Sequence, residues 1–296
     1  MPEFISRHDA SLSVYRSKIK ESNETRSEQV DLLEINSSVA DLVLASVRLD
    51  SYMNLAMDPA SHKAETWESW TTFSEVAEAV FAISQTPEGK KIKRVINGKE
   101  RILEGTGPSY SANAKNWLDA FFLALTCRDQ DRVSFLCKVP VASMREAADA
   151  GGARYHEFIY PWISALQDYI LDRPQLTENL IGSFQLSSPS GSGPQGREFL
   201  DNITFPQINA FYRTIEHNTE DFNRALAQGF QKFHSYQTAT EERKKDLNGV
   251  IPLGLLGISC LAFDISARVP DFNPGFNSDY LPENILSRIW ERRSLS

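Results

Sequence analysis

Apolar residues recur at helical spacing in the stretch 116–140, which shows how the chain is organised. Its first apolar positions fall at i, i+1, i+4, i+5 and i+8, which places them on one wide stripe of a helix. A polar turn over 128–132 follows, and the apolar pattern then resumes as far as Val139. Two helices joined by so few residues are expected to lie antiparallel and to pack on each other. The stripe consists of Trp117, Leu118, Phe121, Phe122 and Leu125.

The same spacing predicts helices along most of the chain. It occurs at 39–57, 67–81 and 153–171, and a second helical pair with an acidic turn is predicted over 208–233. The apolar run 250–263 has 14 residues, whereas a helix that spans a bilayer needs roughly 20, so it is predicted to be a buried core helix. The sequence therefore predicts a mainly all-α fold, an array of antiparallel helical hairpins around one core.

One segment, 91–103, has the pattern of a β-hairpin. Asn97-Gly98 is the preferred pair for a two-residue type I′ turn, and strand-forming residues flank it on both sides. The segment is rich in basic residues, so we expect it to project from the helical body as a candidate contact for an acidic partner. A solvated edge protected by lysines is the alternative interpretation. The candidate contact residues are Lys93, Arg94, Lys99 and Arg101.

Two features bear on domain organisation. Residues 1–22 have weak periodicity and are expected to form an N-terminal arm or a loosely docked helix. A capping-box match at Thr25–Glu28 predicts that the first regular helix begins near residue 26. Residues 23–296 are then expected to form a single helical domain. The Gly/Ser/Pro-rich loop 187–197 is its only plausible internal boundary.

Composition narrows the classes of partner and compartment. The chain has 39 acidic and 31 basic residues and a formal charge of −8. This disfavours nonspecific binding to nucleic acid or anionic membranes and would suit a basic protein partner. The three cysteines form no CxxC pair and lie among apolar residues, as expected of reduced core residues. The N-terminus contains no export signal pattern, so a cytoplasmic location is expected.

The sequence contains no recognisable catalytic constellation. Asp129 and Asp131 could hold magnesium, as in some all-α enzymes, but their DxD spacing at a turn suits helix capping better. A GxGxxG match at 191–196 has no preceding strand, so a flexible loop is the better interpretation. No catalytic, cofactor-binding or metal-binding residue is predicted, and no cofactor is expected.

Several aromatic-rich stretches follow one another in a characteristic order. They are ETWESW at 65–70, NWLDAFFLALTCRDQDR at 116–132, YHEFIYPWISALQDYILDRP at 155–174, FPQINAFY at 205–212 and GLLGISCLAFD at 254–264. In this order the chain resembles the immunity 49 family of bacterial polymorphic toxin systems over most of residues 40–290. The residues that carry the signature are Trp67, Trp70, Trp117, Phe121, Arg128, Asp129, Asp131, Trp162 and Tyr212.

The resemblance implies a helical immunity protein without enzymatic activity. Such a protein binds a cognate toxin, encoded by a neighbouring gene, and neutralises it by stoichiometric protein–protein inhibition. The family supplies no catalytic motif and does not identify the toxin. Two alternatives stay open from the residues alone. The chain could be a helical-hairpin scaffold for a peptide or regulatory protein, or an all-α enzyme that uses magnesium.

Overall fold

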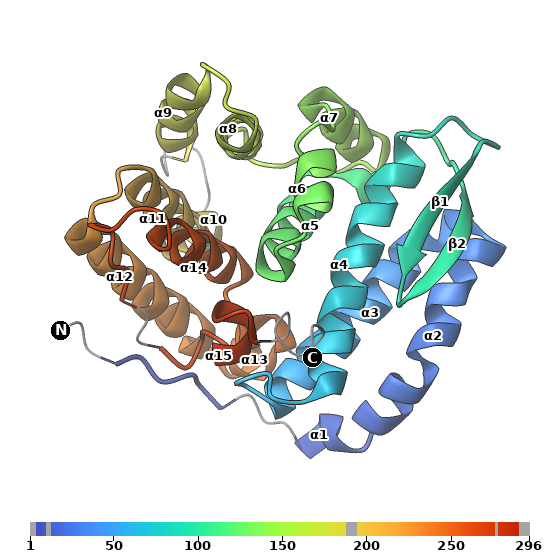
Figure 1. Ribbon diagram of the computed structural model, residues 1–296, viewed down its shortest axis with the longest axis horizontal. Helices are drawn as coiled ribbons and strands as arrows, with labels where there is room; N and C mark the ends of the chain where they lie inside the picture. Colours follow the sequence, from blue (N-terminus) through green and yellow to red (C-terminus); the bar gives the residue numbers. More distant parts are fainter. Residues whose placement is uncertain (1–3, 10–12, 188–193, 276–277, 290–296) are drawn as a thin grey trace.

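The computed structural model describes residues 4–9, 13–187, 194–275 and 278–289, and over these residues the protein is mainly helical (Figure 1). The first part of the chain forms α1 (Ser13–Arg16), α2 (Ile19–Ile35), α3 (Ala40–Met57), α4 (Ala64–Ser84), β1 (Lys91–Ile96), β2 (Lys99–Glu104), α5 (Ala114–Cys127), α6 (Gln130–Leu136) and α7 (Val141–Ala150). The second part forms α8 (Ile159–Ile170), α9 (Leu176–Leu186), α10 (Pro194–Phe199), the π-helical turn η3 (Leu200–Thr204), α11 (Phe205–Ile215), α12 (Thr219–Thr238), α13 (Glu241–Lys245), the 3-10 turn η4 (Leu247–Val250), α14 (Leu253–Ser266) and α15 (Glu283–Leu286).

Helices α5 and α14 lie in the middle of the molecule and connect its two sides. Helix α5 packs against α4 on one side and α14 on the other, and α14 in turn packs against α11. Figure 1 shows α2, α3, α4 and the β-hairpin on one side of this central pair, with α11 and α12 on the opposite side. The predicted helical fold with one small hairpin is confirmed.

The apolar stripe of α5 explains its central place. Trp117 and Phe121 are both buried and stack with ring centroids 5.0 Å apart. The Trp117 indole Nε1 donates a hydrogen bond of 2.9 Å to the Leu136 carbonyl, which fixes α6 beside α5. On the facing helix, a Cβ at Gly257 would lie only 2.7 Å from Phe122 Cδ1. The glycine therefore allows α14 to approach α5 closely.

The apolar segment before and within α14 is part of this core. By length and composition alone, Leu247–Ser266 could cross a membrane, but 72% of its most apolar window is buried inside the protein. A buried core helix of a globular protein has the same composition as a membrane span, because both exclude water on every side. The prediction of a core helix over 250–263 is confirmed.

The turn between α5 and α6 contains the two aspartates with the spacing of a possible metal site. Arg128 adopts a left-handed conformation with φ 54° and ends α5. Its guanidinium pairs with Asp264 of α14 at 3.1 Å and donates to the carbonyls of Ile285 and Leu286. The Asp129 carboxylate accepts the Arg132 backbone N–H at 2.9 Å and caps α6. The turn thus joins helices, as the capping interpretation predicts.

The N-terminal boundary differs from the predicted one. Helix α2 begins at Ile19, and Thr25 lies inside it, where its hydroxyl donates to the Glu21 carbonyl instead of capping a helix. Residues 4–9 pack along the C-terminal segment. Ile5 forms an isolated parallel bridge with Ser278, and the Tyr280 hydroxyl lies 2.8 Å from His8 Nδ1.

The loop predicted at 187–197 lies only partly within the described structure. Residues 188–193, which include the first half of the GxGxxG match, fall outside the described residues, and α10 begins at Pro194. The last helix predicted near 282–292 is short in the described part, where α15 covers Glu283–Leu286. Residues from 290 onward are outside the described part.

Candidate functional site

The β-hairpin forms where predicted but does not project from the helical body. Its strands pair antiparallel with Ile96 opposite Lys99, and Asn97 and Gly98 both have positive φ, as a type I′ turn requires. The inward side chains Ile96 and Leu103 are fully buried. The turn is also held to α4, because the Asn97 N–H donates to the Glu75 carboxylate at 2.7 Å. The prediction of a projecting hairpin is therefore wrong.

Most of the hairpin's candidate contact residues already have acidic partners within the chain. Arg94 pairs with the buried Glu78 of α4 at 3.0 Å. Lys99 lies 3.4 Å from Asp31 of α2. Lys93 pairs with Glu100 on the neighbouring strand at 2.8 Å, and both side chains are exposed. Acidic residues of the same chain thus largely neutralise the charge of these three basic side chains.

Arg101 must be removed from the set of candidate contact residues. Its side chain is 0% exposed, between the hairpin and α2, where it forms an ion pair with Asp31 and donates to the Ile96 carbonyl. The guanidinium hydrogen-bonds the Asp31 carboxylate and holds its pKa below the usual range. Strand alternation explains the error, since residues on successive positions of β2 face opposite sides.

The signature residues form the framework of the protein more than a site. Trp70, Trp117, Phe121 and Trp162 are at most 1% exposed, and Trp70 Nε1 donates to the Thr126 hydroxyl at 2.8 Å. Trp67 and Tyr212 are half-buried, whereas Arg128 is buried at the turn between α5 and α6. Their shared property is that they hold helices together.

The acidic pair in that turn lacks the surroundings of a metal site. Asp129 caps α6 and also lies 3.2 Å from the Arg132 guanidinium, while Asp131 is exposed. Within the described ranges no group of three His, Cys, Asp or Glu side chains could hold a metal ion. The arrangement of Asp129 and Asp131 gives no support to the magnesium interpretation.

The three cysteines are free thiols, of which Cys137 and Cys260 are buried and Cys127 is half-buried against the core. Burial raises the pKa of Cys127 and Cys260 to about 11 and that of Cys137 to about 12. At neutral pH such thiols stay protonated and are poor nucleophiles. They act as small apolar core residues, as the sequence predicts.

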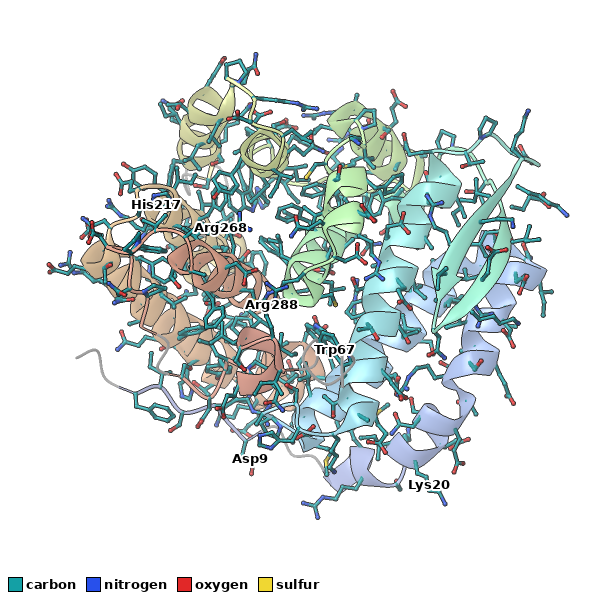
Figure 2. All side chains as sticks on the ribbon, viewed as in Figure 1. Asp9, Lys20, Trp67, His217, Arg268 and Arg288 are labelled. Atoms are coloured by element: carbon teal, nitrogen blue, oxygen red, sulfur yellow. The ribbon has the colours of Figure 1, made fainter. Side chains whose placement is uncertain are left out.

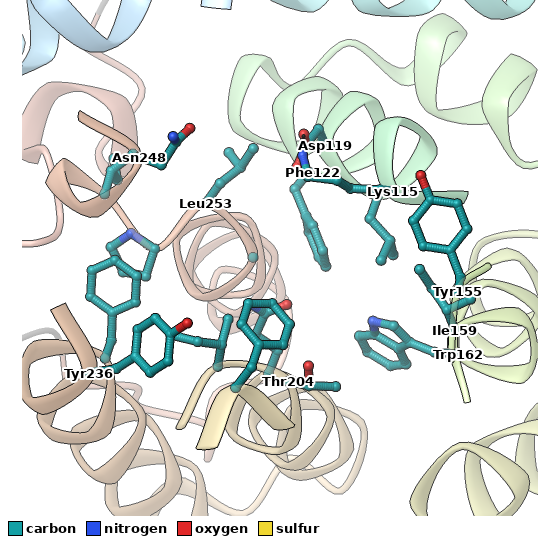
Figure 3. A pocket seen from close by; sticks show the side chains of 18 of the residues that line it. Lys115, Asp119, Phe122, Tyr155, Ile159, Trp162, Thr204, Tyr236, Asn248 and Leu253 are labelled. Atoms are coloured by element: carbon teal, nitrogen blue, oxygen red, sulfur yellow. Dashed lines mark hydrogen bonds and ion pairs between the residues drawn. The ribbon is translucent and has the colours of Figure 1, made fainter. Parts of the chain in front are cut away.

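A cavity between the two sides of the molecule is the best candidate for a binding site. We call it the central cavity; its volume is about 420 Å³, and Figure 3 shows its lining residues. They come from α3, α5, α8, α12, the segment from α10 to α11 and the start of α14. Most of the wall is apolar and aromatic, including Phe122, Ile159, Trp162, Phe199, Phe233 and Leu253.

Several polar side chains in the wall of the central cavity have no hydrogen-bond partner among the residues that the structure describes. Tyr52, Thr204 and Gln237 are only 6–8% exposed. None of these three side chains, nor that of Gln207, makes a hydrogen bond to any residue that the structure describes. The polar atoms of these four side chains are not sealed from solvent, and Gln207 is only half-buried. Water can therefore pair with them, and the polar groups of a bound partner can take the place of that water.

The central cavity also has an excess of positive charge on one side. Asp119 of α5 lies between two cations, with Arg48 of α3 at 2.8 Å and Lys115 at 2.9 Å. Figure 3 shows Asp119 and Lys115 on the same side of the cavity. Together the three groups carry a net charge of +1, although the whole chain carries −8. We call Arg48, Lys115 and Asp119 the cationic rim.

The central cavity has no counterpart in any pattern of the sequence. Its residues come from nine helices and turns between positions 48 and 254 and from the segment before α8, and only the folded chain brings them together. The helical spacing of Trp162 predicts a core anchor, and it is one, at 1% exposed, but it also borders the cavity. Gln207 and Gln237 stood out from no pattern. Each is a polar residue near the apolar stripe of a helix, and such residues are common in helices that have no binding role.

Comparison with known protein families gives one assignment. The family model described as immunity protein 49 matches residues 58–285, well over half of the chain. Comparisons with curated proteins and with solved structures gave no match. The matched range contains all nine signature residues and most of the wall of the central cavity. The chain therefore belongs to the immunity protein 49 family.

Proposed function

We propose that the protein neutralises a cognate bacterial toxin in the cytoplasm by binding it stoichiometrically. The observation that carries this proposal is the match to the immunity protein 49 family over residues 58–285. Membership implies toxin neutralisation, and members of such families are typically inhibitors without enzymatic activity. The toxin is expected to be the product of a neighbouring gene.

Neutralisation by binding requires an interface that occludes or distorts the active site of the toxin. Stable interfaces of this kind bury roughly 1,200–2,000 Å² and depend on a few aromatic and arginine anchors. The formal charge of −8 would attract a basic toxin and speed association. Such steering is screened by salt, so the association rate would fall as the ionic strength rises.

The test uses the wild-type protein with the C-terminal domain of the toxin encoded beside it. Co-expression should restore growth of a host that the toxin alone kills, and the two purified proteins should form a stable one-to-one complex. Titration should abolish toxin activity linearly, with the endpoint at equal amounts. An enzyme would inactivate excess toxin with time, so turnover beyond one equivalent would exclude a purely stoichiometric inhibitor.

A matched control comes from another toxin. An unrelated immunity protein should not rescue the host, and this protein should not protect against an unrelated toxin. Absence of both rescue and complex formation by the wild-type protein would contradict the proposal. The second candidate, a scaffold for a peptide or regulatory protein, gains support from the aromatic wall of the central cavity. If the wild-type protein neither rescues the host nor binds the toxin, the scaffold function becomes the better proposal.

A further inference from the structure

The central cavity has three properties that together describe what it binds. Its wall is mostly apolar, it contains unpaired neutral polar groups, and its rim is cationic. Its volume of about 420 Å³ lies in the range of roughly 300–1,000 Å³ that is usual for ligand pockets. An occupant must therefore suit all three properties at once.

The neutral polar groups match the polar groups of a peptide backbone. The amides of Gln207 and Gln237 each offer a donor and an acceptor, as a backbone amide does, and the hydroxyls of Tyr52 and Thr204 can do either. A bound backbone can replace the water at these groups with direct hydrogen bonds. The wall therefore suits an occupant with regularly spaced N–H and C=O groups.

The apolar wall suits the side chains of the same segment. Trp162 and Phe122 border the cavity from α8 and α5, and Phe233 borders it from α12. Aromatic or aliphatic anchors that enter such pockets contribute most of the binding free energy in protein interfaces. One or more apolar side chains of a partner can therefore lose their contact with water here.

Helix α3, which contributes Arg48 and Tyr52 to the cavity wall, also carries two exposed apolar side chains. Leu42 and Leu49 are 66% and 48% exposed and lie seven positions apart, on one face of the helix. Leu49 precedes Tyr52 by three positions, so the two side chains are neighbours on the helix surface. A small molecule held in the cavity would leave this stripe uncovered, whereas a protein that inserts one segment would cover both.

The cationic rim indicates the charge of that segment. Asp119 can neutralise only one of Arg48 and Lys115, so one positive charge remains beside the apolar wall. A carboxylate on the partner would pair with it in partly desolvated surroundings, where charge-assisted hydrogen bonds are stronger than in water. Charge complementarity therefore favours a segment with an acidic residue next to its apolar ones.

We propose that the central cavity is the docking site for the toxin, which inserts a segment with apolar side chains flanked by an acidic residue. The segment places its apolar side chains against Phe122, Trp162 and Phe233. Its backbone pairs with Tyr52 and Gln237, and its carboxylate pairs with the cationic rim. This inference rests on the proposed function and adds to it the surface and the chemistry of recognition.

The first experiment removes one hydroxyl. Tyr52→Phe deletes a group that bonds to no described residue, so its melting temperature should stay the same or rise. The toxin should bind the variant about tenfold more weakly, because its own polar group then stays unpaired. Tyr169→Phe is the matched control, since the Tyr169 hydroxyl also lacks a partner among the described residues but lies outside the cavity. It should bind the toxin normally.

The second experiment reverses one charge. Lys115→Glu changes the sign of the cationic rim and should weaken toxin binding at least tenfold, mostly at low salt. Lys20→Glu is the matched control. Lys20 also forms an i, i+4 ion pair, with Glu24 at 3.7 Å, on α2 far from the cavity (Figure 2). Both variants change the net charge equally, so an effect of overall charge would affect both.

The outcomes separate this inference from the proposed function. If wild-type protein neither binds nor neutralises the toxin, the proposed function fails first. If wild-type protein binds and Tyr52→Phe and Lys115→Glu bind equally well, the proposed function stands and the docking site is refuted. If the two variants bind toxin normally and yet lose a small molecule that purifies with the wild-type protein, the cavity is a small-molecule site, and the docking site is refuted. Selective weakening of toxin binding in both variants supports the inference.

Discussion

The β-hairpin and the central cavity both contain polar side chains beside apolar ones, but they differ in where those polar groups find partners. In the hairpin, Arg94 and Lys99 pair with carboxylates on α4 and α2. In the cavity, Tyr52 and Gln237 are more than nine-tenths buried and have no partner among the described residues. These polar groups of the hairpin are already paired within the chain, whereas those of the cavity can still form hydrogen bonds with a partner.

This difference shows how far a count of charges can mislead. The hairpin is conspicuous in the sequence because its basic residues are close together. Binding depends instead on which groups remain unsatisfied after folding, because a paired charge must lose one partner to gain another. The inconspicuous Gln207 and Gln237 are therefore better candidates than the four basic residues that the sequence singles out.

The largest expected effect comes from the core of α5, between the two regions. Trp117→Ala removes the ring that stacks on Phe121 and should lower the free energy of unfolding by about 3–5 kcal/mol. Urea denaturation followed by circular dichroism measures the loss. Trp67→Ala is the control, because Trp67 is only half-buried. Equal losses in the two variants would show that α5 is not the framework of the core.

A smaller effect tests whether the hairpin is anchored. Arg101→Ala removes a fully buried side chain that pairs with Asp31, and it should cost about 2–3 kcal/mol of unfolding free energy. Faster hydrogen exchange of the β1 and β2 amides should accompany the loss. Wild-type stability and exchange in this variant would mean that the hairpin is not held by its buried face.

The pH dependence of stability tests how the hairpin is anchored to α4, through the pair of Arg94 and Glu78. Burial raises the pKa of Glu78 above its ordinary value of 4.5, and this outweighs the opposite effect of nearby Arg94. The folded protein then keeps the Glu78 proton to higher pH than the unfolded chain does. The contribution of Glu78 is therefore largest at or below pH 4.5 and declines as the pH rises through the raised pKa.

The variant Glu78→Gln isolates this contribution. The difference in unfolding free energy between wild type and variant should move against the wild type as the pH rises above 4.5. Urea denaturation at a series of pH values measures it, with Glu88→Gln as a control in the loop before β1, where Glu88 is exposed. A difference that moves in the opposite direction would mean that the Arg94 pair dominates.

The smallest expected effect concerns the outer face of the hairpin. Lys93→Ala removes an exposed side chain that pairs only with Glu100, so stability should change by no more than about 0.5 kcal/mol. Toxin affinity should change less than in Lys115→Glu, which a binding titration of the two variants compares directly. A larger loss of affinity in Lys93→Ala would restore the hairpin as the main contact surface.

Elements with strong local signals were predictable from the sequence. The wide stripe of α5, the Asn97-Gly98 turn and the capping carboxylate of Asp129 each act through neighbours a few residues away. Boundaries were less predictable, because Thr25 has the spacing of a cap and yet lies within α2, where tertiary packing continues the helix to Ile19. The burial of Arg101 depended on a partner 70 positions away.

The helical class, the position of the hairpin and, through the order of the aromatic stretches, the family can be predicted from the sequence alone. These features depend on periodicity and local hydrogen bonding, which short segments of chain contain. Which polar groups are paired, and which remain available around the central cavity, depends on how the helices pack. Pairing is a property of distance in space, and Arg48, Lys115, Thr204 and Gln237 line one cavity only after α3, α5, η3 and α12 have packed together.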